Sequence, residues 1–138
     1  MKLSTRGQYA TRAMVQLAIN ANDKPLPIRE IANLEGLSEQ YLEQIFRDLR
    51  KAGLVQSVRG AHGGYLLRHE SERITVGDVI RAVEGPIVPV SCLAPEEICE
   101  KSAKCVSRRV WSKLQNSILE VLDETSLNDM VIMAKEER

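Results

Sequence analysis

The sequence predicts a mainly α-helical fold with one small β-hairpin: a winged helix-turn-helix unit followed by a long dimerisation helix. Three observations favour this fold class. Two short stretches with helical apolar spacing flank a glycine turn at Gly36. A glycine-rich hairpin follows them, and a long apolar stripe begins after Cys105. We expect a DNA-binding domain in residues 1–84, a cysteine-containing loop in 85–105, and the long helix with a short C-terminal helix in 106–138.

The first predicted helix begins at a cap, Ser4 or Thr5, and runs to about Asn22. Its apolar residues keep a helical period: Tyr9, Ala13, Met14, Leu17 and Ala18. The segment 24–27 should then interrupt the chain, because its two prolines disfavour helix at the residues before them.

A helix-turn-helix is predicted between Ile28 and Ala52. A short helix ends at Gly36, which suits the left-handed position after a helix, and Ser38 caps the next helix. In this second helix the inward residues are Tyr41, Leu42, Ile45, Phe46 and Leu49, and the outward residues are Glu39, Gln40, Glu43, Gln44 and Arg47. Such a helix fits the major groove of DNA and touches base edges with its first residues. Glu39 and Glu43 agree with this, because a carboxylate accepts a hydrogen bond from cytosine N4.

A β-hairpin follows, with strands at 54–58 and 65–67 and a turn at 59–64. The glycines of the turn let its backbone approach a phosphate or a narrow groove, and Arg59 suits the same role. A surface helix with a solvated polar face is the simpler interpretation of the second helix alone, but the order of turn, capped helix and hairpin favours DNA. The candidate DNA-binding residues are Ser38, Glu39, Gln40, Tyr41, Glu43, Gln44, Arg47, Arg59, Gly60, His62, Gly63 and Gly64.

Two further helices are predicted beyond the hairpin. Thr75 and Asp78 form a capping-box pair for a helix that ends at Glu84, and an extended segment, 87–90, leads to the cysteines. Near the C-terminus, Ser126 caps a last short helix, and residues 135–138 should be frayed.

The long helix after Cys105 runs to about Asp123. Its apolar residues recur every three or four positions: Val106, Val110, Trp111, Leu114, Ile118, Val121 and Leu122. The helix either packs on its own domain or pairs with a second subunit. The stripe is wide for a small domain, which favours a homodimer through Val106–Asp123 on a palindromic double-stranded DNA operator.

All three cysteines, Cys92, Cys99 and Cys105, lie in one polar loop and at the start of the long helix. Three thiolates within fourteen residues can close on one soft metal centre. Zinc would want a fourth cysteine or histidine at close spacing, whereas an iron–sulfur cluster can take its fourth ligand from elsewhere. Spacing alone leaves three interpretations open: an iron–sulfur cluster, zinc, or free redox-active thiols.

Charge and composition favour a nucleic-acid-binding protein over an enzyme or a membrane protein. Residues 1–68 carry a balance of +4 and residues 69–138 a balance of −4, which suits a nucleic-acid reader joined to a different module. Two histidines and no nucleophile–base pairing argue against an enzyme. We expect no membrane association and a cytoplasmic location, because there is no secretory pattern or long apolar run.

Five stretches resemble the IscR-like family of winged-helix regulators, which includes IscR, NsrR and CymR. They are MKLSTRGQYA (1–10), LSEQYLEQIF (37–46), LRKAGLV (49–55), SVRGAHGGYLL (57–67) and VGDVI (76–80). The resemblance covers nearly the whole chain. It implies a homodimer with crossed long helices, a 2Fe–2S cluster on Cys92, Cys99 and Cys105, and control of genes for iron–sulfur cluster biogenesis. It also implies that Glu43 helps to discriminate between cluster-dependent and cluster-independent DNA sites.

The fourth cluster ligand is the point where this sequence departs from the family. The resemblance implies a histidine three residues after the last cysteine, but Arg108 stands there, and an arginine stays protonated. The gap between the first two cysteines is also one residue longer than in the family pattern. Gln8 occupies the place of a carboxylate that serves in NsrR-type relatives. The candidates are the loop carboxylates Glu96, Glu97 and Glu100, Ser107, Gln8 of a partner subunit, water, or an exogenous thiol.

These observations lead to one expected function and one alternative. The chain is expected to be a sequence-specific transcriptional regulator whose DNA binding is controlled by an iron–sulfur cluster. CymR-like relatives lack the cysteines, so Cys92, Cys99 and Cys105 argue against that branch. The alternative is a repressor of the same fold that responds to thiol oxidation, zinc or nitric oxide without a 2Fe–2S cluster.

Overall fold

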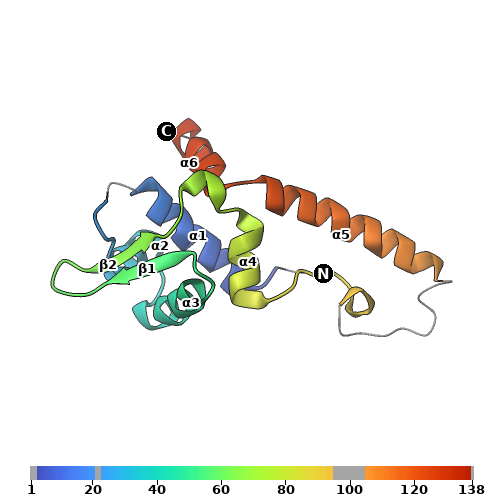
Figure 1. The fold of residues 1–138 in the computed structure, drawn as a ribbon, viewed down its shortest axis with the longest axis horizontal. Coiled ribbons are helices and arrows are strands. Elements are labelled where there is room, and N and C mark those ends of the chain that lie inside the picture. Colours follow the sequence, from blue (N-terminus) through green and yellow to red (C-terminus); the bar gives the residue numbers. More distant parts are fainter. Residues whose placement is uncertain (1–2, 21–22, 95–104, 138) are drawn as a thin grey trace.

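The computed structural model describes residues 3–20, 23–94 and 105–137, and these residues form helices around one small β-hairpin (Figure 1). The helices are α1 (Thr5–Ile19), α2 (Ile28–Glu35), α3 (Glu39–Lys51), α4 (Val76–Glu84), α5 (Val106–Glu124) and α6 (Leu127–Glu136), with the 3₁₀ turns η1 (Ser71–Arg73) and η2 (Ser91–Leu93). The strands are β1 (Val55–Val58) and β2 (Gly64–Leu67). The expected winged helix-turn-helix with a following long helix is confirmed.

The core forms where α1 meets α2, α3, α4 and α6. Only apolar residues are buried among those described, as expected from the hydrophobic effect. Its largest fully buried side chains are Phe46, Met14, Ile31, Leu42, Ile45, Leu49, Ile74, Leu127, Val55 and Val79. They come from α1, α2, α3, β1, α4 and α6, and from Ile74 before α4. Four of them, Leu42, Ile45, Phe46 and Leu49, belong to the predicted inward face of α3, so this face packs on the core.

The hairpin is antiparallel, with Val55 opposite Leu67 and Val58 opposite Gly64. Leu26 extends it by an isolated bridge, in which the Leu26 N–H donates to the Tyr65 carbonyl at 3.0 Å and the Tyr65 N–H donates to the Leu26 carbonyl at 2.9 Å. The Tyr65 ring also packs on Phe46 of α3, with the ring centroids 4.6 Å apart. The hairpin is therefore held against both the α1–α2 connection and α3.

α5 extends away from the body of the protein (Figure 1). None of its residues is buried, and it contacts α4 and η2. α6 then returns to the core, where it packs on α1 and η1 through Leu127 and Val131. The predicted division of the chain at residues 84 and 105 remains a prediction; α6, which that division groups with α5, packs with the first segment.

Two local expectations were wrong. The first helix ends at Ile19 rather than near Asn22, and Asn20 serves as its C-cap. Lys135 and Glu136 belong to α6 rather than to a frayed end. A capping box at Ser126 fixes the start of α6, and the buried Leu127 and Val131 hold the helix against the core. The turns η1 and η2 were not predicted.

Candidate DNA-binding surface and cysteine segment

Local hydrogen bonds set the start of the candidate recognition helix, α3. Gly36 adopts the left-handed conformation at φ 67°, which a side chain would disfavour, and ends α2 there. The hydroxyl oxygen of Ser38 then accepts from the Tyr41 N–H at 3.1 Å and caps α3. The turn therefore fixes the direction in which α3 leaves α2.

The outward face of α3 is the face that the sequence predicted. Glu39, Gln40, Glu43, Gln44 and Arg47 are exposed, and Ser38 is exposed at the cap. Tyr41 is half-buried instead, since its ring meets Tyr9 of α1 edge-on at 5.9 Å. The structure thus brings these polar side chains together on one surface, with Tyr41 at its border.

The tip of the wing is exposed at Arg59, Gly60 and His62. Gly63 and Gly64 are half-buried, and for a reason internal to the hairpin. A Cβ on Gly64 would collide with the Leu26 backbone, and one on Gly63 with the Val58 carbonyl. These two glycines are therefore required by the packing of the wing itself, whatever they contact in DNA.

A groove runs between α3 and the wing. Its lining includes Glu43 and Arg47 from the predicted set, together with Arg50, Ser57 and Val58. Arg50 bridges the groove, with its Nη1 donating to the Ser57 hydroxyl oxygen at 3.4 Å. Its charged lining residues are Glu43, Arg47 and Arg50, so its walls carry more positive than negative charge.

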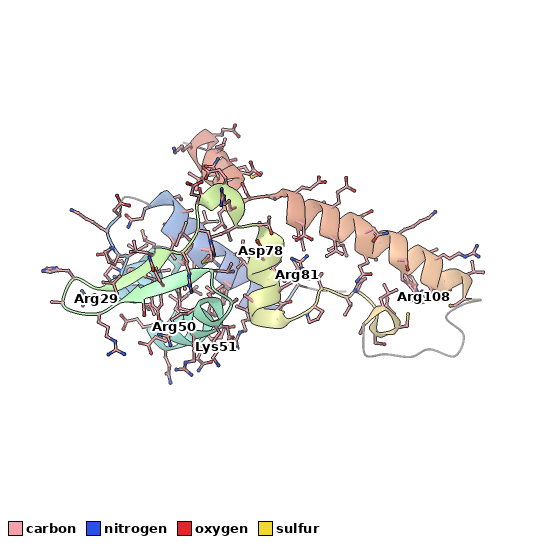
Figure 2. The ribbon with its side chains drawn as sticks, viewed as in Figure 1. Arg29, Arg50, Lys51, Asp78, Arg81 and Arg108 are labelled. Carbon is pink, nitrogen blue, oxygen red and sulfur yellow. The ribbon has the colours of Figure 1, made fainter. Side chains whose placement is uncertain are left out.

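The cations of the domain differ in whether they form an ion pair. Arg6 is paired with Asp48, and Arg12 with Glu35 at 3.4 Å. Arg29, Arg47 and Lys51, by contrast, make no ion pair among the described residues. Figure 2 shows Arg29, Arg50 and Lys51 on the opposite side of α4 from α5. Unpaired cations on this side can meet phosphates without first breaking an ion pair.

Arg29, Arg50 and Ser57 were missing from the predicted DNA-binding set. For Arg50 a signal was available, because it lies three positions after Arg47 and seven after Glu43 on the same face of one helix. For Arg29 and Ser57 the sequence offered no comparable signal. Their place beside α3 depends on how α2 and the hairpin pack.

The structure describes two of the three predicted cluster ligands. Cys92 lies in η2, and Cys105 is the N-cap residue of α5; both are half-buried free thiols. Cys99 and the loop carboxylates Glu96, Glu97 and Glu100 lie outside the described residues. Within the described ranges, no three potential ligands gather into a metal site. η2 contacts α5, so the elements that carry Cys92 and Cys105 are neighbours.

The other candidate ligands have distinct surroundings. Gln8 is exposed, and its Nε2 donates to the Leu3 carbonyl at 3.0 Å. Ser107 is exposed in the first turn of α5. Arg108 is half-buried, and its Nε is enclosed without a hydrogen-bond partner. Figure 2 shows Arg108 near the end of α5 that lies away from the body.

These residues fit an anionic iron–sulfur centre. Two unbonded thiols provide the soft ligands that iron prefers. The enclosed Arg108 Nε is a donor that lacks an acceptor, and a negatively charged group beside Cys105 would supply one.

In the part of the chain that the structure describes, no helix combines the length and hydropathy of a transmembrane span.

Comparison with known proteins gives consistent matches. Residues 3–132 match the model of the Rrf2 family, described as an iron-dependent transcriptional regulator. The chain is 45% identical to the HTH-type transcriptional regulator CymR of Bacillus subtilis over 94% of this chain and 89% of that protein. The solved structure of that CymR, described as the global cysteine regulator of B. subtilis, aligns with a TM-score of 0.82 over 96% of this chain and 98% of the other.

Relatives named IscR match to a similar degree. The HTH-type transcriptional regulator IscR of Aliivibrio salmonicida is 40% identical over 96% of this chain and 78% of its own length. The solved structure of T. potens IscR is 43% identical, with a TM-score of 0.83 over all of this chain and 91% of the other. Identity alone therefore does not separate the CymR-named from the IscR-named relatives.

Proposed function

The chain belongs to the Rrf2 family of transcriptional regulators, and from this premise we propose that it is a homodimeric, sequence-specific regulator controlled by an iron–sulfur cluster. Its relatives are DNA-binding regulators rather than enzymes, which agrees with the expected class. The observation that best supports DNA binding is the exposed polar face of α3, which lies beside the wing and unpaired cations. DNA reading, dimerisation and sensing fall to different elements of the chain.

DNA reading is assigned to α3 and the wing. α3 enters the major groove, where Gln40, Glu43 and Gln44 reach base edges, and Ser38, Glu39 and Tyr41 lie at its leading end. Arg47 and Arg50 meet phosphates along the groove, and Arg59 and His62 at the wing tip reach the neighbouring backbone or minor groove. Gly60, Gly63 and Gly64 keep that tip thin.

Dimerisation is assigned to α5. Val106, Val110 and Val121 are 72%, 54% and 65% exposed on a helix that buries no residue in one protomer. A mainly apolar groove continues this face. Its lining residues are Leu3, Ile80, Pro86, Ile87, Val88, Pro89, Ile118, Val121 and Leu122, together with Glu84 and Ser117. A second copy of α5 is the occupant that buries both, since a twofold interface uses the same patch on each subunit. Two α3 helices then face the half-sites of a palindromic operator.

The sensing role is assigned to Cys92, Cys99 and Cys105, whose thiolates would hold a 2Fe–2S cluster with an unidentified fourth ligand. The cluster would supply sensitivity to iron, redox state or nitric oxide. The residues of the chain supply the connection to DNA binding. Cys92 lies in η2, η2 contacts α5, and Gln115 of α5 donates to the carbonyl of Ile87 at 3.0 Å. Holding Cys92 and Cys105 together therefore fixes η2 and the start of α5.

A second candidate is supported by the CymR-named relative. In this alternative the same fold responds to thiol oxidation, zinc or nitric oxide without a 2Fe–2S cluster. Two observations favour it: 45% identity to the B. subtilis CymR, and the arginine at position 108 in place of the expected histidine. Genes for iron–sulfur cluster biogenesis are the proposed targets of the cluster-dependent form, which would act in the cytoplasm.

Protein purified without oxygen separates the two candidates. We expect bound iron and sulfide, visible absorption from thiolate-to-iron charge transfer, and loss of both in Cys92→Ala. Ser91→Ala is the matched control, because Ser91 is the exposed neighbour of Cys92 in η2. A colourless wild-type protein that takes up no iron on reconstitution, with Cys92→Ala regulating normally, would contradict the cluster. Bound zinc, or a thiol oxidation that changes DNA binding, would then support the alternative.

A further inference from the structure

α4 connects α5 to the DNA-reading part of the protein. Among the described residues α5 buries no side chain and has its main contacts with α4 and η2. α4 in turn packs on α1 and α3. The contact between α4 and α5 therefore sets the angle between α5 and the recognition helix α3.

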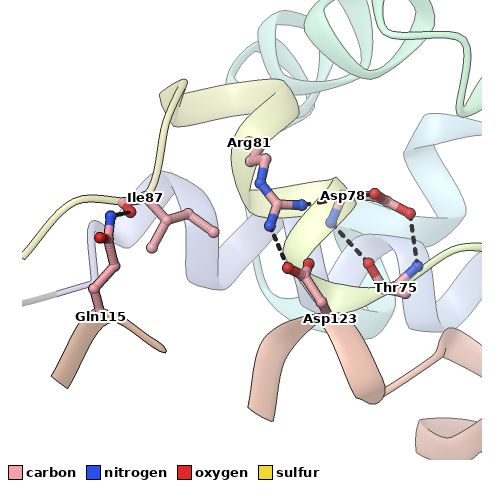
Figure 3. A network of polar contacts seen from close by, with 6 residues as sticks. All are labelled: Thr75, Asp78, Arg81, Ile87, Gln115 and Asp123. Carbon is pink, nitrogen blue, oxygen red and sulfur yellow. Dashed lines mark hydrogen bonds and ion pairs between the residues drawn. The ribbon is translucent and has the colours of Figure 1, made fainter. Parts of the chain in front are cut away.

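One charged pair joins α4 to the end of α5 (Figure 3). Arg81 of α4 donates from Nη2 to Oδ2 of Asp123 at the end of α5, at 2.5 Å. Its Nη1 lies 3.8 Å from Asp78, which also completes the capping box of Thr75. The hydrogen bond to Asp123 raises the pKa of Arg81 above its ordinary value, so the guanidinium stays charged at any working pH. Arg81 thus ties the end of α5 to the first turn of α4.

The backbone leaves little freedom around this pair. A Cβ on Gly77 would collide with the Asp123 carboxylate, so any larger residue at position 77 would displace that carboxylate from its place beside Arg81. Directly after α5, the Val76 N–H donates to the Thr125 carbonyl at 2.9 Å, and the Leu127 N–H donates to the Ile74 carbonyl at 2.8 Å. The end of α5 is therefore fixed by one ion pair and two backbone hydrogen bonds.

We propose that Arg81 and Asp123 are positioning residues that set the separation of the two recognition helices in the dimer. This inference rests on the proposed homodimer through α5. In such a dimer each α3 is carried at a fixed angle from the shared α5 pair, and half-sites must match a separation of about one helical turn of DNA. A small rotation at Asp123 changes that separation, whereas the outward face of α3 stays intact. The pair therefore governs half-site spacing rather than base recognition.

Asp123→Asn tests this directly, because it removes the charge with little change of size. Glu124→Gln is the matched control, since Glu124 is the exposed neighbour of Asp123 with no ion pair among the described residues. The probes are labelled duplexes carrying two copies of the half-site that the wild-type protein selects from random DNA. Their spacers are the selected length, one base pair shorter or one base pair longer, and a single half-site duplex completes the set.

For Asp123→Asn we expect affinity for the selected spacing to fall about fivefold or more, with weaker preference among spacers and unchanged affinity for the single half-site. Gly77→Ala should act in the same direction, since it displaces the Asp123 carboxylate without removing a charge. Glu124→Gln should match the wild type. Because exposed ion pairs add little stability, the variants should remain folded dimers by melting and sedimentation. If Asp123→Asn does not dimerise, Arg81→Gln is measured in its place with the same set of duplexes.

Two results would overturn the inference. One is a dimeric Asp123→Asn protein with the affinity and spacer preference of the wild type. The other is an equal loss on single and paired half-sites, which indicates a general structural role. A wild-type protein that sediments as a monomer while bound to a single half-site would instead refute the proposed homodimer, and the inference with it.

Discussion

Arg50 illustrates how a single side chain connects two parts of the proposed DNA-binding surface. It extends from the last turns of α3 across the groove to Ser57 of the wing, at 3.4 Å. A bond of that length to an exposed hydroxyl contributes little to stability, and it leaves the remaining guanidinium donors available. We therefore propose that Arg50 holds a phosphate between α3 and the wing.

Arg50→Ala should weaken DNA binding by a similar factor on all sequences, because a phosphate contact carries no base information. The slope of log affinity against log salt should fall by about one, as one fewer counterion is released. Fluorescence anisotropy at several salt concentrations measures both. Arg73→Ala in η1 is the control for charge alone. An unchanged slope in Arg50→Ala, or the same change in Arg73→Ala, would refute the phosphate contact.

Arg108 is the second informative residue, because it stands where the resemblance implies a histidine ligand. Arg108→His should lengthen the lifetime of the cluster in air severalfold and change its visible spectrum, since a neutral imidazole can bind iron and a guanidinium cannot. Arg108→Ala should retain iron at the wild-type level. Absorbance and iron content over time give the readout, with Arg109→His as the control at the exposed neighbour. Equal behaviour of the two histidine variants would show that position 108 does not reach the cluster.

Among the elements, α5 combines an exposed apolar face with the absence of any fully buried residue. Val106, Val110, Leu114 and Val121 follow one another at intervals of four, four and seven residues, so they share one face of the helix. Trp111 and Leu114 are less exposed, at 38% and 37%, than the valines. An apolar stripe of this length facing water is unfavourable in an isolated protomer, which is the physical basis of the proposed dimer.

Val110→Glu should weaken the dimer by about 2 kcal/mol or more, because it places a charge in an apolar contact. The protomer should keep its fold, since Val110 is exposed within it. Sedimentation at several concentrations measures the dissociation constant, and operator affinity should fall with dimer content. Asn116→Glu adds the same charge at another exposed position of α5. Sedimentation of Val110→Glu as a stable dimer would exclude this face as the interface.

α6 is the element that returns the chain to the core. Leu127 is wholly buried, so Leu127→Ala should lower the free energy of unfolding by about 2–5 kcal/mol, measured by urea denaturation. Met133 lies on the same helix and is 52% exposed; Met133→Ala should change stability by about 0.5 kcal/mol or less. Similar losses in the two variants would indicate that α6 does not pack as described.

Helix starts could be predicted from the sequence because capping is local. Ser4, Ser38, Thr75 and Ser126 all accept from a backbone N–H in the first turn of the helix that each was expected to begin. The docking of α6 on α1 and the turns η1 and η2 could not be predicted, since they depend on contacts between distant segments. The same distinction explains the candidate site. The outward face of α3 follows from helical period, whereas the pairing of Arg6 with Asp48 joins residues far apart in the chain.

At the scale of the whole molecule, the three proposed functions fall on different parts of the chain. Arg29 of α2 and Arg50 and Lys51 of α3, which we propose face DNA, lie on the opposite side of α4 from α5 (Figure 2). The described cysteines lie in η2 and at the free end of α5, and the Arg81–Asp123 pair lies between these regions. This arrangement explains how a formally neutral chain binds DNA, because residues 1–68 carry the positive balance. A signal from Cys105 would reach α3 through α5 and α4, and one from Cys92 could also reach α4 along residues 85–90.

The operator affinity of one anaerobic preparation, measured before and after removal of its iron, tests the central claim most directly. The duplex is the one that the iron-loaded wild-type protein selects from random DNA. We predict a change in affinity of at least about fivefold, or a change in the preferred site, when iron is lost, and no response in Cys92→Ala. Equal affinity and equal site preference with and without iron would contradict control by a cluster on Cys92, Cys99 and Cys105.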